Sequence, residues 1–203
     1  TCVTDLYIMH PGSEPTAVTV AWLVRNQANP DPVDVTYTVG PGETLTLADV
    51  ILEEFGLTTG EGAFRVTADT EVVVNSRIYS SADGVTYGQG FEGTPVGLAT
   101  GSGGRTDIGG RSSNAQFRTN VYACAGPNGA TLDMVLVAPD GSEIATETKV
   151  LQAWMPFLRR IDQLMATGNF DDGTLRVTVS EGSGVVGASK VDGASSDPTT
   201  LEG

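Results

Sequence analysis

A pattern of two apolar–polar alternating segments occurs twice, and it constrains the fold more than any other feature of the chain. The first copy reads GAFRVTA at 62–68 and VVVNSRIY at 72–79; the second reads GTLRVTV at 173–179 and VVGASKV at 185–191. Strict alternation predicts strands with one buried face. The link at 69–71 has the length of a hairpin connection, so we predict that each copy is a β-hairpin. The repetition predicts an internal duplication.

Further short strands are predicted by the same alternation on either side of this pair. They cover 3–10, 17–24, 33–39, 43–47 and 86–89 in the first half, and 119–122, 130–137 and 144–151 in the second. The segment 86–89 reads as an edge strand. Two stretches, 49–55 and 154–165, predict short helices; in the second, Phe157, Ile161 and Leu164 share one helical face. The sequence therefore predicts an all-β, mainly antiparallel fold with two related β-sandwich lobes, each with one short helix.

The domain organisation follows from a shift in composition near the middle of the chain. Residues 92–116 are rich in glycine, serine and threonine, which favours a flexible or looped connector. We therefore predict a first repeat over 1–91 and a second over 117–203. The lobes could pack side by side or form one fused body with a pseudo-two-fold axis, and we favour two packed lobes.

The charge balance excludes two classes of partner. The chain has 25 acidic and 11 basic residues, a net charge of -14. An acidic surface repels nucleic-acid phosphates and anionic membrane surfaces. No apolar run reaches the roughly 18 residues that a membrane helix needs. Acidity of this kind keeps an exposed protein soluble, and a high-salt or extracellular habitat also fits it.

Two cysteines, Cys2 and Cys124, form no metal-site spacing. Each lies near the first strand of its own repeat, so a disulfide between the repeats is a reasonable expectation. Two buried free thiols are the alternative.

Metal and catalytic residues are sparse. His10, the only histidine, lies at a strand end and is expected to be structural; there is no serine nucleophile motif to pair with it. Calcium needs only oxygen ligands from loops. Its weak candidates are Asp31 and Asp34, beside Asn29, and the pair Asp171 and Asp172. None has EF-hand spacing, so solvated acidic loops are favoured and no cofactor is expected.

Ligand recognition could use aromatic or arginine side chains. Trp22 alternates with valines and is expected in the core, whereas Trp154 and Tyr87 are candidates for an exposed ligand face. Arg65 and Arg176 occupy equivalent places in the two copies. Each could bind a carboxylate, but a cross-strand ion pair or a solvated position is the simpler expectation.

Several short motifs together resemble a repeat found in large secreted bacterial proteins. They are TDL at 4–6, PGETL at 41–45, LADV at 47–50, GAFRV at 62–66, SRIY at 76–79, TYGQ at 86–89, RTN at 118–120 and VDGASSDPT at 191–199. The resemblance covers most of the chain and implies an extracellular β-sandwich module, often appended to larger surface chains. The PGETL turn also resembles one in bacterial immunoglobulin-like modules, which are mostly structural or adhesive. The two cysteines depart from the usual pattern.

The functional expectation is a non-enzymatic extracellular structural or adhesive module, of which a self-assembling surface or filament subunit is one form. Its expected partners are copies of itself or other surface proteins. The alternative is a glycan- or ligand-binding module aided by calcium. A hydrolase using loop carboxylates is a third and weaker reading, because 25 acids always allow some pair to be imagined.

Overall fold

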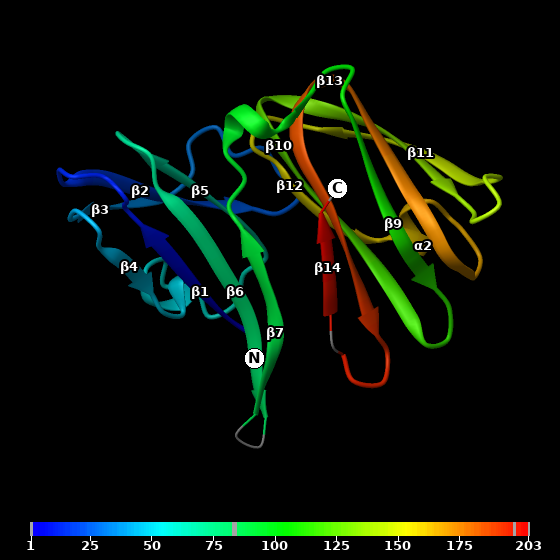
Figure 1. The fold of residues 1–203 in the computed structure, drawn as a ribbon, viewed down its shortest axis with the longest axis horizontal. Helices are drawn as coiled ribbons and strands as arrows, with labels where there is room; N and C mark the ends of the chain where they lie inside the picture. Colours follow the sequence, from blue (N-terminus) through cyan, green and yellow to red (C-terminus); the bar gives the residue numbers. More distant parts are fainter. Residues whose placement is uncertain (1, 83–84, 197, 203) are drawn as a thin grey trace. The chain divides into compact units, whose positions relative to one another are not determined.

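A computed structural model describes residues 2–82, 85–196 and 198–202 (Figure 1). Its strands are mostly antiparallel, which confirms the predicted all-β class. The chain divides into two compact units. Unit 1 comprises Thr1–Val24 and Asp31–Gly93, and unit 2 comprises Arg25–Pro30 and Thr94–Gly203.

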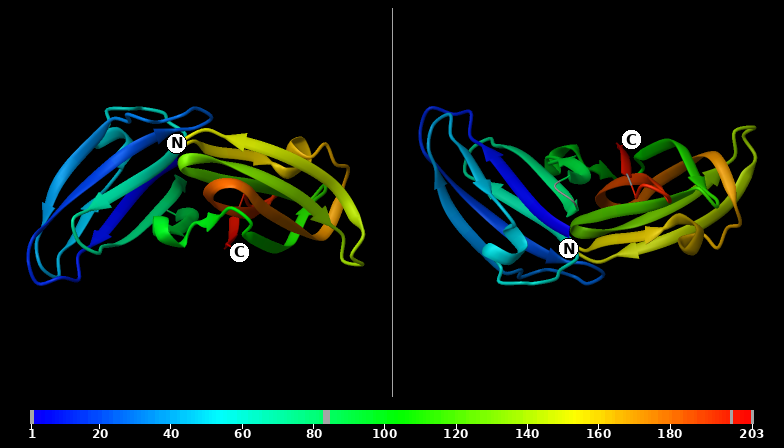
Figure 2. Two further views of the ribbon diagram at one scale, coloured as in Figure 1. Left: turned by 90° about the horizontal axis from the view of Figure 1, so that it is seen from above. Right: turned by 90° about the horizontal axis from the view of Figure 1, so that it is seen from below.

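Unit 1 has two sheets, ordered β4-β1-β6-β7 and β3-β2-β5. Its elements are β1 (Cys2–Met9), β2 (Thr16–Val24), β3 (Asp34–Val39), β4 (Thr44–Leu47), α1 (Val50–Glu53), β5 (Gly62–Ala68), β6 (Val73–Ala82) and β7 (Val85–Glu92). The strand β7 ends the order of its sheet, as predicted for 86–89. The strands of unit 1 are drawn in blue to green in Figure 2.

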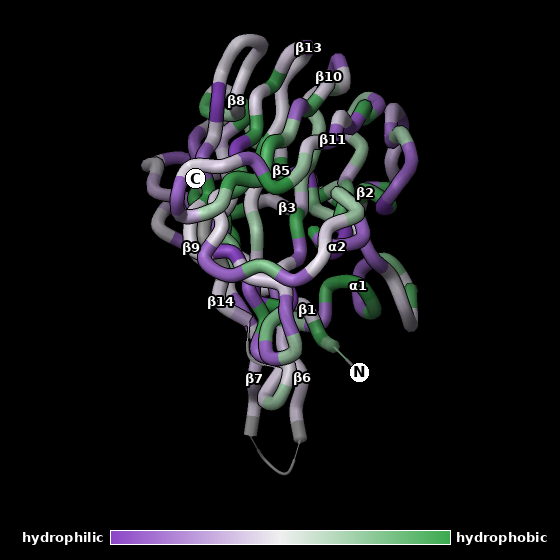
Figure 3. Tube along the Cα trace, turned by 90° about the vertical axis from the view of Figure 1, so that its right-hand side faces the viewer, coloured by the Kyte–Doolittle hydropathy of each residue, from purple (hydrophilic) through white to green (hydrophobic). Residues whose placement is uncertain are grey.

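Both sheets of unit 1 contribute to a single core. Leu6 and Ile8 of β1 are buried together with Val18 and Val20 of β2. Alternation along each strand places these side chains on one face and polar ones on the other; Figure 3 shows hydrophobic and hydrophilic segments alternating along the chain. Trp22 is 6% exposed, with its ring centroid 5.2 Å from that of Phe64, so its predicted core position is confirmed.

Unit 2 is organised around two long strands. Its elements are η1 (Val96–Leu98), β8 (Thr100–Gly101), β9 (Arg105–Ser113), β10 (Phe117–Val137), β11 (Glu143–Leu151), β12 (Pro156–Arg160), α2 (Ile161–Leu164), β13 (Phe170–Asp192) and β14 (Pro198–Glu202). The sheet order is β11-β10-β13-β14, with β12 paired to β10, and β8 and β9 paired to β13.

The long strands β10 and β13 change neighbours part of the way along. Residues 117–125 of β10 pair with 184–192 of β13, and 120–124 also pair with β12. After a register shift, 130–137 pair with 174–182 of β13 and with β11. Gly129 and Gly182 lie at this shift with φ of 78° and 72°, and a Cβ on Gly182 would lie 2.1 Å from the Gly129 carbonyl oxygen. Only glycine fits that approach.

The predicted hairpins are wrong. In unit 1, β5 pairs with β2 while β6 pairs with β1, so residues 69–71 link two sheets instead of closing a turn. In unit 2, the corresponding residues form the continuous strand β13. The link Asp69-Thr-Glu has none of the glycine or asparagine that a tight two-residue hairpin turn requires. A short polar link crosses between layers just as readily.

The predicted helix over 154–165 is also largely wrong. Residues 156–160 form β12, paired with 120–124, and only 161–164 are helical. Phe157 and Ile161 are buried as expected, 5% and 0% exposed. Two apolar residues four apart suit a helix face, but a strand followed by one helical turn buries them equally well. Pairing with β10 decided the outcome.

The glycine-rich stretch 92–116, predicted as a looped connector, contains the strand β9. It pairs with β13 and buries Ile108, which is 1% exposed. Glycines at 109 and 110 interrupt the alternation and coincide with register shifts in the pairing, so the local pattern resembles a loop.

Candidate functional site

The outward face of the sheet β4-β1-β6-β7 gathers a group of aromatic, arginine and methionine side chains. Leu6 and Ile8 of β1 are buried, so their neighbours Asp5 and Tyr7 belong to the opposite face of the sheet. Strand register sets Val3, Asp5 and Met9 opposite Tyr79, Arg77 and Val73 of β6. We call this surface the Tyr–Arg face; it comprises Asp5, Tyr7, Met9, Val73, Arg77 and Tyr79.

Asp5 anchors the Tyr–Arg face through hydrogen bonds to its carboxylate. It is 8% exposed, and its carboxylate accepts a hydrogen bond from the Tyr7 hydroxyl at 3.3 Å and one from the Asp49 backbone N–H at 3.0 Å. The negative charge of the same carboxylate also acts on Tyr79. Burial, and next the negative charge of Asp5, raise the pKa of Tyr7 and of Tyr79. Both tyrosines therefore stay protonated donors at neutral pH.

Arg77 is exposed, lies over the Tyr79 ring and is the cross-strand partner of Asp5. Its guanidinium carbon is 4.6 Å from the centroid of the Tyr79 ring, within cation–π range, and Nη2 donates to Thr86 Oγ1 at 2.8 Å. Gly90 of β7 lies opposite Arg77 in the register, and a Cβ there would meet nothing closer than 3.6 Å. The bare backbone leaves room beside the guanidinium.

The face combines a charged centre with an apolar end. Met9 and Val73, which are cross-strand partners, are 37% and 48% exposed. Tyrosine, arginine and methionine are enriched in protein–protein interfaces, and tyrosine and arginine often dominate their binding energy. The arrangement suits contact with another protein, because its donors are held in place before a partner arrives.

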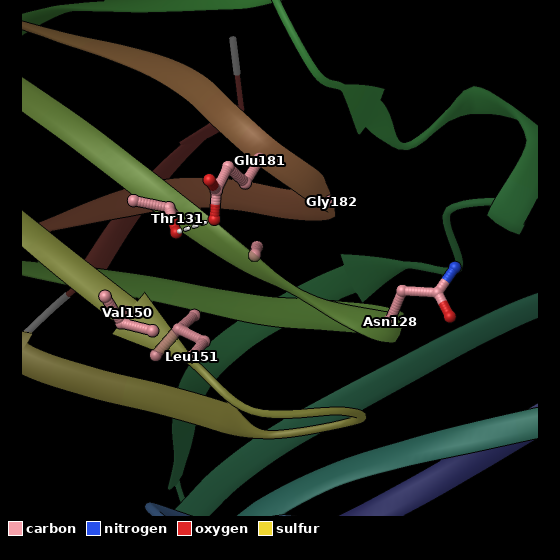
Figure 4. A pocket seen from close by; sticks show the side chains of 7 residues that line it. Asn128, Thr131, Val150, Leu151, Glu181 and Gly182 are labelled. Carbon is pink, nitrogen blue, oxygen red and sulfur yellow. Dashed lines mark hydrogen bonds between the residues drawn. The ribbon is translucent and has the colours of Figure 1, made fainter.

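A surface pocket of about 110 Å³ lies in unit 2, where β10 and β13 shift register (Figure 4). It is lined by Asn128, Ala130, Thr131, Val150, Leu151, Glu181 and Gly182. Thr131 Oγ1 donates to Glu181 Oε2 at 3.5 Å. Glu181 is the one ionisable residue of this lining, so the pocket suits binding of a small polar group.

The calcium candidates do not come together. Asp31 and Asp34 belong to unit 1 and are exposed, whereas Asp171 and Asp172 belong to unit 2. Asp171 accepts a hydrogen bond from Asn114, and Asp172 lies 3.9 Å from the ammonium of Lys190. Within the residues that the structure describes, no three His, Cys, Asp or Glu side chains are grouped to hold a metal ion.

Both cysteines are free thiols, so the expected disulfide is not formed. Cys2 belongs to unit 1 and is exposed, with Sγ 3.1 Å from Ser80 Oγ. Cys124 belongs to unit 2, and burial raises the pKa of its thiol to about 11. The alternative expectation of two buried thiols is therefore wrong for Cys2.

The aromatic candidates differ in their roles. Tyr87 on β7 is 43% exposed, as a ligand-face residue requires. Trp154 is half-buried in a left-handed backbone conformation, with φ of 52°. Its carbonyl oxygen accepts a hydrogen bond from the Asn29 side chain at 2.9 Å. Trp154 thus has a structural place in unit 2 that its sequence context does not reveal.

Arg65 and Arg176, the arginines at equivalent places in the two copies, agree mainly with the simpler expectation of a cross-strand ion pair or a solvated position. Arg176 Nε lies 3.0 Å from Asp107 Oδ1 across the β9–β13 pairing, a cross-strand ion pair. Arg65 is half-buried on β5. His10 is 1% exposed and bonded to neighbouring backbone, which agrees with a structural strand-end residue.

Sequence reasoning missed the Tyr–Arg face. Its signal was present, because Tyr7 alternates with Leu6 and Ile8 and must face away from the core. What the sequence did not give is the register that sets Asp5 opposite Arg77.

None of the helices in the described ranges has the length and apolar character that crossing a membrane requires. Protein-family models, curated proteins and solved structures were each compared with the chain, and none of the three comparisons found a significant match.

Proposed function

We propose that the chain is a non-enzymatic extracellular structural or adhesive module, and that it contacts other proteins, including copies of itself, through the Tyr–Arg face. The observation that carries this proposal is the exposed arginine held on Tyr79 above a buried carboxylate, beside an apolar end. A preorganised surface of this composition suits protein contact.

The module consists of two related β-sandwich lobes that arose by duplication. Strand pairing supports this reading. In unit 1, β1 pairs with β4 and β6, while β2 pairs with β3 and β5. In unit 2, the first part of β10 pairs with β12 and the end of β13, and its second part pairs with β11 and the beginning of β13. The two schemes match strand for strand if β10 and β13 each correspond to two strands of unit 1.

An extracellular location is supported by the resemblance to secreted bacterial repeats and by the charge. Unit 1 contains 13 acidic and 2 basic residues, a net charge of -11, and unit 2 contains 12 and 9, a net charge of -3. These sum to the -14 of the whole chain. Strong self-repulsion keeps a surface-exposed protein from aggregating without specificity.

Sedimentation velocity of the full chain over a wide concentration range tests the proposal. The wild type should associate as concentration rises, and Arg77→Glu should abolish that association. Arg159→Glu, which reverses an exposed arginine on β12, is the matched control and should associate normally. Monomers at every concentration, or equal association of both variants, would contradict self-association through this face.

A glycan- or ligand-binding module aided by calcium is the second candidate, and the pocket beside Glu181 favours it. Thr131, Asn128 and Glu181 supply donors and acceptors of the kind that sugar hydroxyls use. Glycan-array binding that is lost in Glu181→Gln would support it. If the chain binds no glycan on the arrays, with or without calcium, this second candidate function is contradicted.

A further inference from the structure

The strand β7 forms one edge of the sheet β4-β1-β6-β7 in unit 1 and is uncharged over most of its length. It has eight residues, Val85–Glu92, and pairs with β6 in an unbroken register (Figure 1). Residues 85–91 contain no proline and no charged side chain. By contrast β4, at the other edge of the same sheet, has four residues. A long edge strand without charges or proline is a template for pairing with another chain.

The register of β7 determines which of its backbone groups point away from β6. The Gly93 N–H donates to the Val74 carbonyl at 2.7 Å. Hydrogen-bonded and non-hydrogen-bonded pairs alternate along an antiparallel ladder, so the odd-numbered residues of β7 bond β6. The even-numbered residues direct their N–H and C=O groups outward from the edge; they are Thr86, Gly88, Gly90 and Glu92.

Two of these outward-directed residues are glycines on the Tyr–Arg face. Gly88 lies opposite Tyr79 in the register, and Gly90 lies opposite Arg77. A Cβ on Gly90 would meet no atom closer than 3.6 Å, so packing within the chain does not require glycine there. Glycine inside a strand often marks a place where another backbone approaches closely. The edge of β7 is therefore open to a neighbouring strand.

The charges beside this edge indicate which strand fits it. The Arg77 guanidinium reaches β7, where its Nη2 donates to Thr86 Oγ1 at 2.8 Å. Glu92, the one charged residue of β7, is exposed and lies on the same face at the other end of the strand, opposite Asn75. An antiparallel copy of β7 reverses this order. It therefore presents a carboxylate to each guanidinium, and two-fold symmetry makes the contact twice.

We propose that β7 pairs antiparallel with β7 of a second copy of this chain about a two-fold axis, which joins two four-stranded sheets into one of eight strands. The axis passes between the two Gln89 residues. Thr86, where Arg77 is held, then lies opposite Glu92 of the second copy, and Gly88 lies opposite its Gly90. The pairing rests on the proposed self-association through the Tyr–Arg face and specifies its geometry.

The same register also suits the other face of the sheet. Tyr87 is on the face opposite to Arg77 and is 43% exposed. In the paired strands it lies opposite Phe91 of the second copy. Aromatic residues directly opposite each other on neighbouring strands stabilise a sheet. One register therefore brings together both arginine–glutamate pairs and both aromatic pairs.

Charge reversals in the full chain test the pairing by sedimentation velocity. Arg77→Glu and Glu92→Arg should each abolish association, because each sets like charges opposite one another. The double variant should restore association. A lower net negative charge by itself favours association, so a loss in Glu92→Arg has the sign that only a specific contact gives. Glu14→Arg, the same change at an exposed position of the β1–β2 connection, is the control and should not weaken association.

A cysteine on the two-fold axis measures the register directly. In a Cys2→Ser background, Gln89→Cys should form a disulfide between two copies on mild oxidation. Non-hydrogen-bonded partners have Cα atoms about 4.5 Å apart, which is within disulfide range. Tyr87→Cys in the same background is the control. Its two copies would lie roughly 13 Å apart along the strands, so it should not cross-link.

The outcomes separate the pairing from the wider proposal of self-association. A cross-link at position 89 and not at 87, with association restored in the double variant, would support the pairing. Wild-type association without that cross-link or that restoration would overturn it and leave self-association through the Tyr–Arg face in another geometry. A wild type that stays monomeric at every concentration would overturn both.

Discussion

Several buried polar side chains of the described residues donate to backbone carbonyls, among them Asn29, Thr119 and Arg111. Arg111 is the largest of them at 1% exposure. Its Nε donates to the Gly109 oxygen at 2.8 Å and its Nη1 to the Ala188 oxygen at 3.2 Å, and burial lowers the pKa of the guanidinium. One side chain of β9 thereby reaches the distant half of β13.

Arg111→Ala should destabilise unit 2 by about 3 kcal/mol. The buried Ala188 carbonyl loses its donor at a cost of about 1–3 kcal/mol. The bond to the exposed Gly109 and the packing of the aliphatic stem are also lost. Arg159→Ala, at an exposed position of β12, is the control and should change the unfolding free energy by less than about 0.5 kcal/mol. Equal urea midpoints for the two variants would contradict the structural role of Arg111.

Thiol reactivity should separate the two cysteines. With its pKa raised to about 11 by burial, Cys124 stays protonated and unreactive at neutral and mildly alkaline pH, because the thiolate is the nucleophile. Cys2 is exposed and should react. Titration with Ellman's reagent should give one thiol in the native protein and two in denaturant. No reactive thiol without reductant would instead mean that the disulfide forms.

At the scale of the element, β11 illustrates how an edge strand is kept from pairing further. Glu147 and Lys149 pair in register with Met134 and Leu132, whose side chains are in the core, so both charged residues are on the core-facing side of the strand. Lys149 Nζ lies 5.1 Å from the centroid of the Phe157 ring. Inward-pointing charges at a sheet edge oppose edge-to-edge association.

Replacing both charges, Glu147→Val with Lys149→Val, should make the protein aggregate through β11. The core-facing side of the edge becomes continuously apolar, and an apolar strand edge is a template for pairing. Thr146→Val with Thr148→Val adds the same β-branched side chains to the outward face and is the matched control. Light scattering and thioflavin fluorescence during storage should rise much more for the first pair. Equal behaviour would argue against the protective role.

Alternation of apolar and polar residues predicted most strands because burial of one face depends on nearest neighbours in sequence. Which strand each one pairs with depends on contacts far along the chain. Residues 62–68 and 72–79 carry correct strand patterns, but they belong to different sheets. The Tyr–Arg face was missed for the same reason, since it exists only through the register of β1 with β6.

At the scale of the whole molecule, the division into units does not follow a single cut in the sequence. Residues Arg25–Pro30, the first part of the connection from β2 to β3, belong to unit 2. The Asn26 N–H donates to the Pro156 oxygen at 2.8 Å, and the Asn29 N–H to the Ala153 oxygen at 3.1 Å. The Asn29 side chain is 5% exposed and bonds Gln27 and Trp154 carbonyls. The polar composition of this segment gives no sign of these distant partners.

A fragment spanning 94–203 should therefore be less stable than unit 2 within the full chain. Without residues 25–30, the carbonyls of Ala153, Trp154 and Pro156 lose their donors. A synthetic peptide of residues 25–30, added in excess, should raise the thermal midpoint of the fragment through binding to its folded state. The same peptide with Asn29→Ala should have a smaller effect. A fragment that is as stable as unit 2 within the intact protein would contradict this prediction.

The segment Arg25–Pro30 also bears on how the gene can recombine. A recombination event that transferred only the later half of the gene would encode unit 2 without the segment Arg25–Pro30. Recombination between related genes should therefore keep both units together. Gene shuffling should give folded proteins only where the breakpoint keeps Arg25–Pro30 with the rest of unit 2.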